Sequence, residues 1–125
     1  MSSGSTAAGS FIGAYVAKND DFFDAQRDAS LMSSLTAKHG HRDELAAILS
    51  QASEGLPGCR SYVVALDTSR DDMIWVTEVW ESKELHEASL KTPKVMDAIA
   101  KGRPLVTNFG VKVETIVVSA VRSPA

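Results

Sequence analysis

Three side chains in one short stretch could carry proton-transfer chemistry on an aromatic molecule: Glu78, Trp80 and His86. Glu78 lies in the segment MIWVTEVW, residues 73–80, which is otherwise almost entirely apolar. A carboxylate held among apolar side chains is suited to accepting a proton, and a histidine is a second candidate base. Trp80 offers a flat apolar wall for an aromatic ring. The stretch therefore offers candidate bases and an aromatic wall for a small-molecule site.

Each of these residues also has a structural interpretation. Glu78 could be a buried carboxylate that accepts hydrogen bonds from backbone N–H groups or an arginine. Trp80 could pack the junction between a strand and the following helix, and His86 could be a solvated or capping helix residue. The sequence leaves both interpretations open.

Three further residues could hold a polar ligand. Tyr62 lies in a strand-like segment, and its alternative role is packing with one hydrogen bond from its hydroxyl. Arg103 and Asn108 lie in or beside a predicted loop over residues 104–110, and loops on a rigid scaffold often carry binding residues. Their alternative role is to cap backbone groups.

Composition limits the possible partners. The 125 residues contain 13 Lys and Arg against 16 Asp and Glu, a net charge of −3 with no basic cluster. This balance argues against nucleic acid or an anionic membrane as the partner. The only cysteine, Cys59, and the absence of paired Cys or His spacing predict neither a disulfide nor a metal site. The apolar run at residues 11–17 is too short to span a bilayer, so we expect a cytoplasmic protein.

The chain divides into three parts by its patterning. Residues 1–28 are predicted to be a flexible leader and an arm, the arm holding a short strand at 11–16 and a helical turn at 20–27. Residues 29–121 form one domain, and residues 122–125 are a tail. Within the domain the patterns predict strands at 29–38, 59–67, 73–80 and 111–121 and helices at 43–54, after Ser82 and after Thr92. Thr92 and Ser82 are predicted N-caps, with Pro93 in the first helical turn.

The order β-α-β-β-α-β is that of the ferredoxin-like α+β fold, a four-stranded antiparallel sheet with helices on one face. Such a sheet usually alternates apolar and polar residues. Residues 73–80 are apolar on both faces, since Ile74 and Val76 alternate with Met73 and Trp75. The second face needs cover, and the simplest cover is the same face of another copy around a two-fold axis. We therefore predict a homodimer with its sheets face to face.

Several motifs resemble a known family in their order and spacing over residues 29–120. They are KHGHRDEL at 38–45, LPGC at 56–59 followed by Tyr62, and EVW at 78–80 followed by SKE at 82–84. Together they are similar to the antibiotic biosynthesis monooxygenases, which include quinol monooxygenases. The resemblance implies a dimeric α+β barrel and, for some members, oxidation of phenols or quinols by O2 without metal or flavin.

Two positions depart from the family pattern. Ser89 and Lys94 stand where members commonly have histidines, and His86 lies one helical turn before Ser89. The haem-degrading relatives fit less well, because Ser89 and Ile99 fall where their functional tryptophan and histidine would lie.

The resemblance implies a cofactor-independent monooxygenase acting on a small phenol or quinol with O2. Glu78 and His86 are its candidate catalytic residues. The candidate substrate-binding residues are Tyr62, Trp80, Ser89, Arg103 and Asn108, and no metal or cofactor is expected. Two alternatives stay open: a dimer that binds a small ligand without catalysis, and an isomerase or signal-degrading enzyme on the same scaffold.

Overall fold

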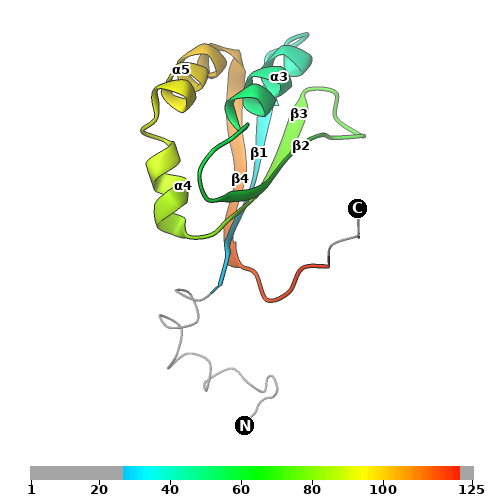
Figure 1. Cartoon of the computed structure of the whole chain (residues 1–125). Helices are drawn as coiled ribbons and strands as arrows, with labels where there is room; N and C mark the ends of the chain where they lie inside the picture. The colour runs from blue at the N-terminus through cyan, green and yellow to red at the C-terminus, as the bar shows by residue number, and fades with distance from the viewer. Residues whose placement is uncertain (1–26, 122–125) are drawn as a thin grey trace.

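The computed structural model describes residues 27–121 and has the ferredoxin-like α+β fold (Figure 1). Its elements in chain order are β1 (Ala29–Ala37), α3 (Arg42–Ala52), β2 (Cys59–Leu66), β3 (Met73–Trp80), α4 (Lys83–Ser89), α5 (Pro93–Gly102), the 3-10 turn η2 (Arg103–Leu105) and β4 (Val106–Ile116). The predicted β-α-β-β-α-β order is confirmed, with α4 and α5 together in the place of its second helix.

The four strands form one antiparallel sheet in the order β2-β3-β1-β4. The helices lie on one face of this sheet, so the two faces have different surroundings (Figure 1). We call them the helix face and the open face. Strands β2 and β3 are consecutive in the chain and pair as an antiparallel hairpin.

Strand β3 alternates strictly between the two faces. Ile74, Val76, Glu78 and Trp80 point to the helix face and are all buried. The residues between them, on the open face, are only half-buried. Ile74 and Val76 join Leu45 of α3 and Ala37 of β1 in the hydrophobic core. The core therefore lies between β3 and the helices, directly beside Glu78.

Both predicted helix caps are present. The Ser82 hydroxyl accepts a hydrogen bond from the Leu85 N–H at 3.1 Å, and the Thr92 hydroxyl accepts one from the Val95 N–H at 3.4 Å. Pro93 occupies the first turn of α5, where a missing N–H costs nothing. These caps fix two short helices at an angle to one another instead of one long helix (Figure 1).

Two predictions about the chain after residue 92 were wrong. The segment predicted as a loop at 104–110 is mostly strand, because residues from Val106 onward pair with β1. A bulge interrupts this pairing, and there the Val111 N–H donates to the Ser34 hydroxyl at 2.8 Å. The strand also ends at Ile116, short of residue 121.

The predictions for residues 11–16 and 20–26 lie outside the described residues. Within residues 27–121, no helix is both long enough and apolar enough to cross a bilayer.

Gly58, in the turn before β2, allows α4 to pack closely against that turn. Gly58 has φ +81°, and a Cβ there would lie 2.5 Å from Leu85 Cδ1 and 2.9 Å from Leu85 Cβ. Gly55 has φ +70° but nothing within 4 Å of its Cβ position. Both glycines therefore have a left-handed backbone that favours glycine. Only at Gly58 does the missing Cβ also leave space for a neighbouring helix.

We predict that Gly58→Ala destabilises the protein more than Gly55→Ala does. A left-handed backbone costs a residue with a Cβ about 1–2 kcal/mol, and overpacking adds about 1–3 kcal/mol at Gly58 only. Urea denaturation of both variants measures the difference in free energy of unfolding. Equal losses in the two variants would show that Leu85 and α4 move aside freely.

Candidate functional site

A cavity of about 510 Å³ lies between the helix face of the sheet and the three helices. Its walls are mainly apolar and come from every helix and from all four strands. The apolar lining residues include Leu35, Leu45, Ile48, Leu49, Leu56, Leu90, Val95, Ile99, Val106 and Phe109. The polar and charged residues along it include Tyr62, Glu78, His86, Ser89, Arg103 and Lys112. A volume of this size and a mostly apolar lining are typical of small-molecule sites.

The Glu78 carboxylate is the buried charge of this cavity, with the residue only 8% exposed. Its Oε1 accepts a hydrogen bond of 2.9 Å from the Trp80 indole Nε1 and lies 3.6 Å from His86 Nε2. Its Oε2 accepts no hydrogen bond from residues 27–121. A buried carboxylate normally has most of its acceptor positions filled. Glu78 therefore retains acceptor capacity that a ligand proton or hydroxyl could fill.

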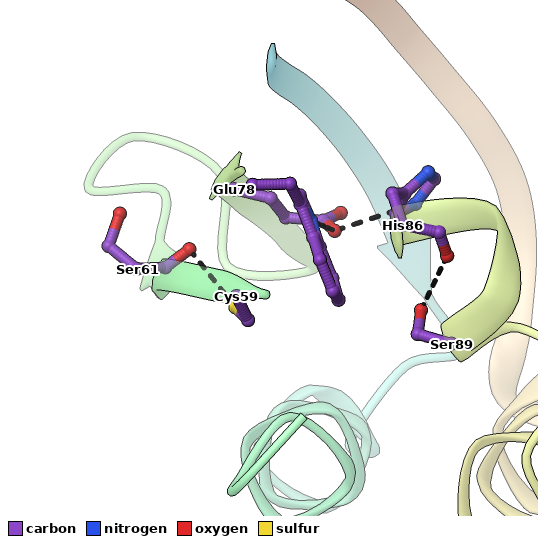
Figure 2. Close-up of polar contacts among 6 residues, drawn as sticks. Cys59, Ser61, Glu78, His86 and Ser89 are labelled. Carbon is purple, nitrogen blue, oxygen red and sulfur yellow. Dashed lines mark hydrogen bonds and ion pairs between the residues drawn. The ribbon is translucent and has the colours of Figure 1, made fainter. Parts of the chain in front are cut away.

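His86 faces Glu78 from the first helix after β3. The two side chains point toward one another from α4 and β3 (Figure 2). The His86 ring also makes an edge contact with the Trp80 ring, with centroids 5.3 Å apart and planes at 63°. Glu78, Trp80 and His86 are thus one contact group, as a shared proton-transfer site requires.

A second cavity of about 590 Å³ lies on the other side of this group. It is lined by both charged and apolar residues, including Asp28, Leu31, Lys83, Glu84 and Glu114. Trp80 and His86 line both cavities, so they form the partition between them. His86 thereby has one side toward the buried carboxylate and another toward a more polar space.

Tyr62 lies directly across from Glu78 in the β2–β3 pairing, on the helix face. Its hydroxyl has no hydrogen-bond partner in the described part of the chain. Burial first, and then the negative charge of Glu78, raise the pKa of Tyr62 well above its ordinary value. Tyr62 is therefore a neutral phenol, able to donate a hydrogen bond to an oxygen of a ligand.

Ser89 and Cys59 have hydrogen bonds within the chain. The buried Ser89 hydroxyl donates to the backbone carbonyl of His86 at 2.6 Å, as Figure 2 shows, so its one proton is already used. The Cys59 thiol donates to the Ser61 carbonyl at 3.5 Å, and burial raises the pKa of Cys59. A thiol held protonated is a poor nucleophile.

Arg103 and Asn108 lie differently from the prediction of one closing loop. Arg103 is in η2 and lines the cavity. Asn108 is an exposed residue within β4 that pairs with Thr36 on the open face, and it is not among the cavity-lining residues. A contact between Asn108 and a ligand in this cavity of the same chain has no structural support.

Sequence reasoning missed Lys112, which lies on the helix face of β4 and lines the cavity. The signal was available, because Lys112 interrupts an apolar strand between Val111 and Val113 just as Glu78 interrupts β3. The wrong loop assignment placed the start of that strand too late. Leu45 and Ile99 also line the cavity, and this could be recognised only from the way the helices pack on the sheet.

The fold and this geometry can be compared with known proteins. The antibiotic biosynthesis monooxygenase family matches residues 30–101. The chain belongs to this family. The matched region contains Glu78, Trp80 and His86, and it ends before Arg103. A comparison with curated proteins finds no match.

Solved structures of the same family are similar over most of the domain. A family member from Chloroflexus aurantiacus J-10-fl is 46% identical, with a TM-score of 0.75, covering 76% of this chain and 97% of its own. A family member from Deinococcus radiodurans is 25% identical, with a TM-score of 0.64, covering 78% and 99%. SnoaB from Streptomyces nogalater, a cofactor-independent oxygenase, is 15% identical, with a TM-score of 0.60, covering 79% and 99%. At that identity SnoaB shows a shared fold.

We predict that Tyr62 makes the protein sensitive to alkaline pH. The native state keeps the Tyr62 proton, whereas the unfolded chain loses it above an ordinary tyrosine pKa of about 10. Only the unfolded chain gains free energy from losing this proton at high pH. The free energy of unfolding is therefore unaffected by Tyr62 below pH ~10 and falls as the pH rises further. Urea denaturation just below and above that pH measures the fall.

Tyr62→Phe is the matched variant for this measurement, because it keeps the ring and removes the titrating group. Its free energy of unfolding should fall less between the two pH values than that of the wild type. An identical fall in both proteins would show that other groups cause the alkaline loss.

Proposed function

We propose that this family member is a cofactor-independent monooxygenase that oxidises a small phenol or quinol with O2. The observation that carries the proposal is the buried Glu78 carboxylate, with an unfilled acceptor oxygen, in contact with His86 at the wall of an apolar cavity. Such a group can take a proton from a hydroxyl bound in a site that excludes bulk water.

The reaction balances without a cofactor because the substrate itself supplies the electrons. Glu78 takes the hydroxyl proton, and the phenolate passes electron density to O2, forming a carbon–oxygen bond at a ring carbon. The resulting peroxide loses its distal oxygen as water, with the ring C–H proton and the proton taken at the start. One oxygen atom of O2 stays in the quinone product, and the other leaves in water.

The neighbouring residues have separate parts in this proposal. Tyr62, held as a neutral phenol, donates a hydrogen bond to the developing oxyanion. The Trp80 indole fixes the Glu78 carboxylate by its 2.9 Å hydrogen bond. His86 lines both cavities, so it passes the proton between Glu78 and the more polar second cavity. Ser89 positions His86 through its backbone carbonyl.

A homodimer is the second part of the proposal. One row across the open face consists of Val63, Thr77, Met32 and Val113. The Val63 side chain is 53% exposed, and Met32 and Val113 are each 43% exposed. Strand β4 is exposed almost throughout. A row with exposed apolar side chains on three of the four strands is a surface that water disfavours, and the same face of a second copy fits it by symmetry.

We predict that Glu78→Gln lowers kcat for oxygen uptake by roughly 10²–10⁴-fold, the usual contribution of a general base. Glutamine keeps the size of the side chain and an oxygen for Trp80, so the fold should persist. Oxygen uptake on metal-stripped protein with a panel of quinols and phenols measures the rate.

Glu87→Gln is the matched control, because Glu87 is an exposed residue on the same helix as His86. Its rate should equal that of the wild type. Equal uptake by the wild type, Glu78→Gln and buffer would leave a ligand-binding role without catalysis. Turnover without O2 would instead indicate an isomerase-type reaction.

We predict that Val113→Lys weakens dimerisation by roughly tenfold or more, since a buried ammonium at an interface is strongly unfavourable. Met96→Lys is the control, because Met96 is an exposed apolar residue on α5, away from the open face. Sedimentation equilibrium measures both. A monomeric wild type, or equal dissociation constants in all three proteins, would contradict the proposed interface.

A further inference from the structure

We infer that Ser34 is a positioning residue that acts through the register of β4. Its hydroxyl holds a β-bulge opposite it, and this bulge decides which side chains at 112–116 line the cavities and which join the open face. The inference rests on the proposed function only where it concerns the homodimer. We call Ser34 and Gly110, one of the two residues opposite it, the bulge pair.

The bulge shifts β4 by one residue relative to β1. Leu35 pairs with Phe109. Two residues earlier in β1, Ser33 pairs with Lys112, which is three residues further along β4. Because side chains alternate between the two faces of a strand, one extra residue reverses the side of every residue beyond it. The lining of the first cavity agrees, since Phe109 and Lys112 both face it.

This shift sorts the side chains beyond the bulge. Lys112 lines the first cavity, and Glu114 and Ile116 line the second. Val113 faces the other way and pairs with Met32 in the open-face row. Without the extra residue, Val113 would face the helices, and Lys112 and Glu114 would lie on the open face. The bulge therefore supplies the open face with an apolar residue and the cavities with charged ones.

Two contacts hold the bulge in place at Ser34, which is only 3% exposed although it lies on the open face. The extra residue takes the Val111 N–H out of the regular ladder, and the Ser34 hydroxyl accepts it at 2.8 Å. Gly110 lies against this hydroxyl, since a Cβ on Gly110 would be 2.5 Å from Ser34 Oγ. The φ of Gly110 is outside the left-handed region, so lack of space excludes a larger residue there.

Engineered disulfides report the register directly. In a Cys59→Ser background, the native pair is Met32→Cys with Val113→Cys, which oppose one another on the open face. The shifted pair is Met32→Cys with Lys112→Cys, which point to opposite faces unless β4 slips by one residue. Oxidation of dilute protein and mass spectrometry of the monomer-sized band measure both cross-links.

We expect Ser34→Ala to lower the ratio of native to shifted cross-link by roughly tenfold or more, the usual effect of leaving a buried N–H unpaired. Ser33→Ala is the matched control, because Ser33 is the adjacent serine and its side chain makes no hydrogen bond within residues 27–121. It should leave the ratio unchanged.

Deletion of Gly110 is the second variant. It removes the extra residue and keeps Met32 opposite Val113, so Ser34→Ala should no longer change the ratio in that background. If Ser34→Ala alone does not fold, recovery of folding by the deletion supports the inference, and no recovery overturns it.

An unchanged ratio in Ser34→Ala, or an equal fall in Ser33→Ala, would overturn the inference. An equal effect of Ser34→Ala with and without Gly110 would do the same. Sedimentation equilibrium tests the link to assembly, because Ser34→Ala should raise the dimer dissociation constant as Val113→Lys does. A monomeric wild type whose ratio still depends on Ser34 would support the bulge pair and contradict the homodimer. The cross-links require no turnover, so an absence of oxygen uptake would contradict the monooxygenase proposal alone.

Discussion

The buried charge of Glu78 is the constraint on which the rest of the site depends. A carboxylate among apolar side chains is unfavourable unless its oxygens have partners. Trp80 supplies one partner from two residues along the same strand, and His86 supplies another from the following helix. Both partners contact the same oxygen, Oε1. The arrangement holds the charge in place and leaves Oε2 for a ligand.

The local structure that positions these groups follows from short-range chemistry. Strand alternation places Glu78 and Trp80 on one face, and the Ser82 cap begins α4 close enough to bring His86 back over them. Gly58 keeps the space in which Leu85 and α4 lie. A substitution at any of these positions would alter the surroundings of the Glu78 carboxylate through one or two intervening contacts.

The sequence predicted the fold well because its signals are local. Alternation, caps and turn glycines determine β3, α4 and α5 residue by residue, and the motifs at 38–45, 56–59 and 78–84 supplied the family. Strand β4 was placed too late because its first residues look like a loop. Only pairing with β1 makes them a strand, and that pairing is not visible in one segment alone.

The candidate site was predicted in part for the same reason. Glu78, Trp80 and His86 are neighbours in sequence, and their contacts could be anticipated. Arg103 and Lys112 flank the misplaced loop, so their common cavity emerged only with the register of β4. Ser89, expected to bind substrate, lines the cavity and donates its hydroxyl proton to the helix backbone, a detail that only atomic positions give.

The central claim is that O2 reacts directly with a phenol activated by Glu78. The most direct measurement is mass spectrometry of the product formed under isotopically labelled O2 by metal-stripped protein. The account predicts one labelled oxygen atom in the quinone product, and no labelled product above the buffer background with Glu78→Gln. A product labelled from water instead, or equal labelling by the variant and the wild type, would contradict it.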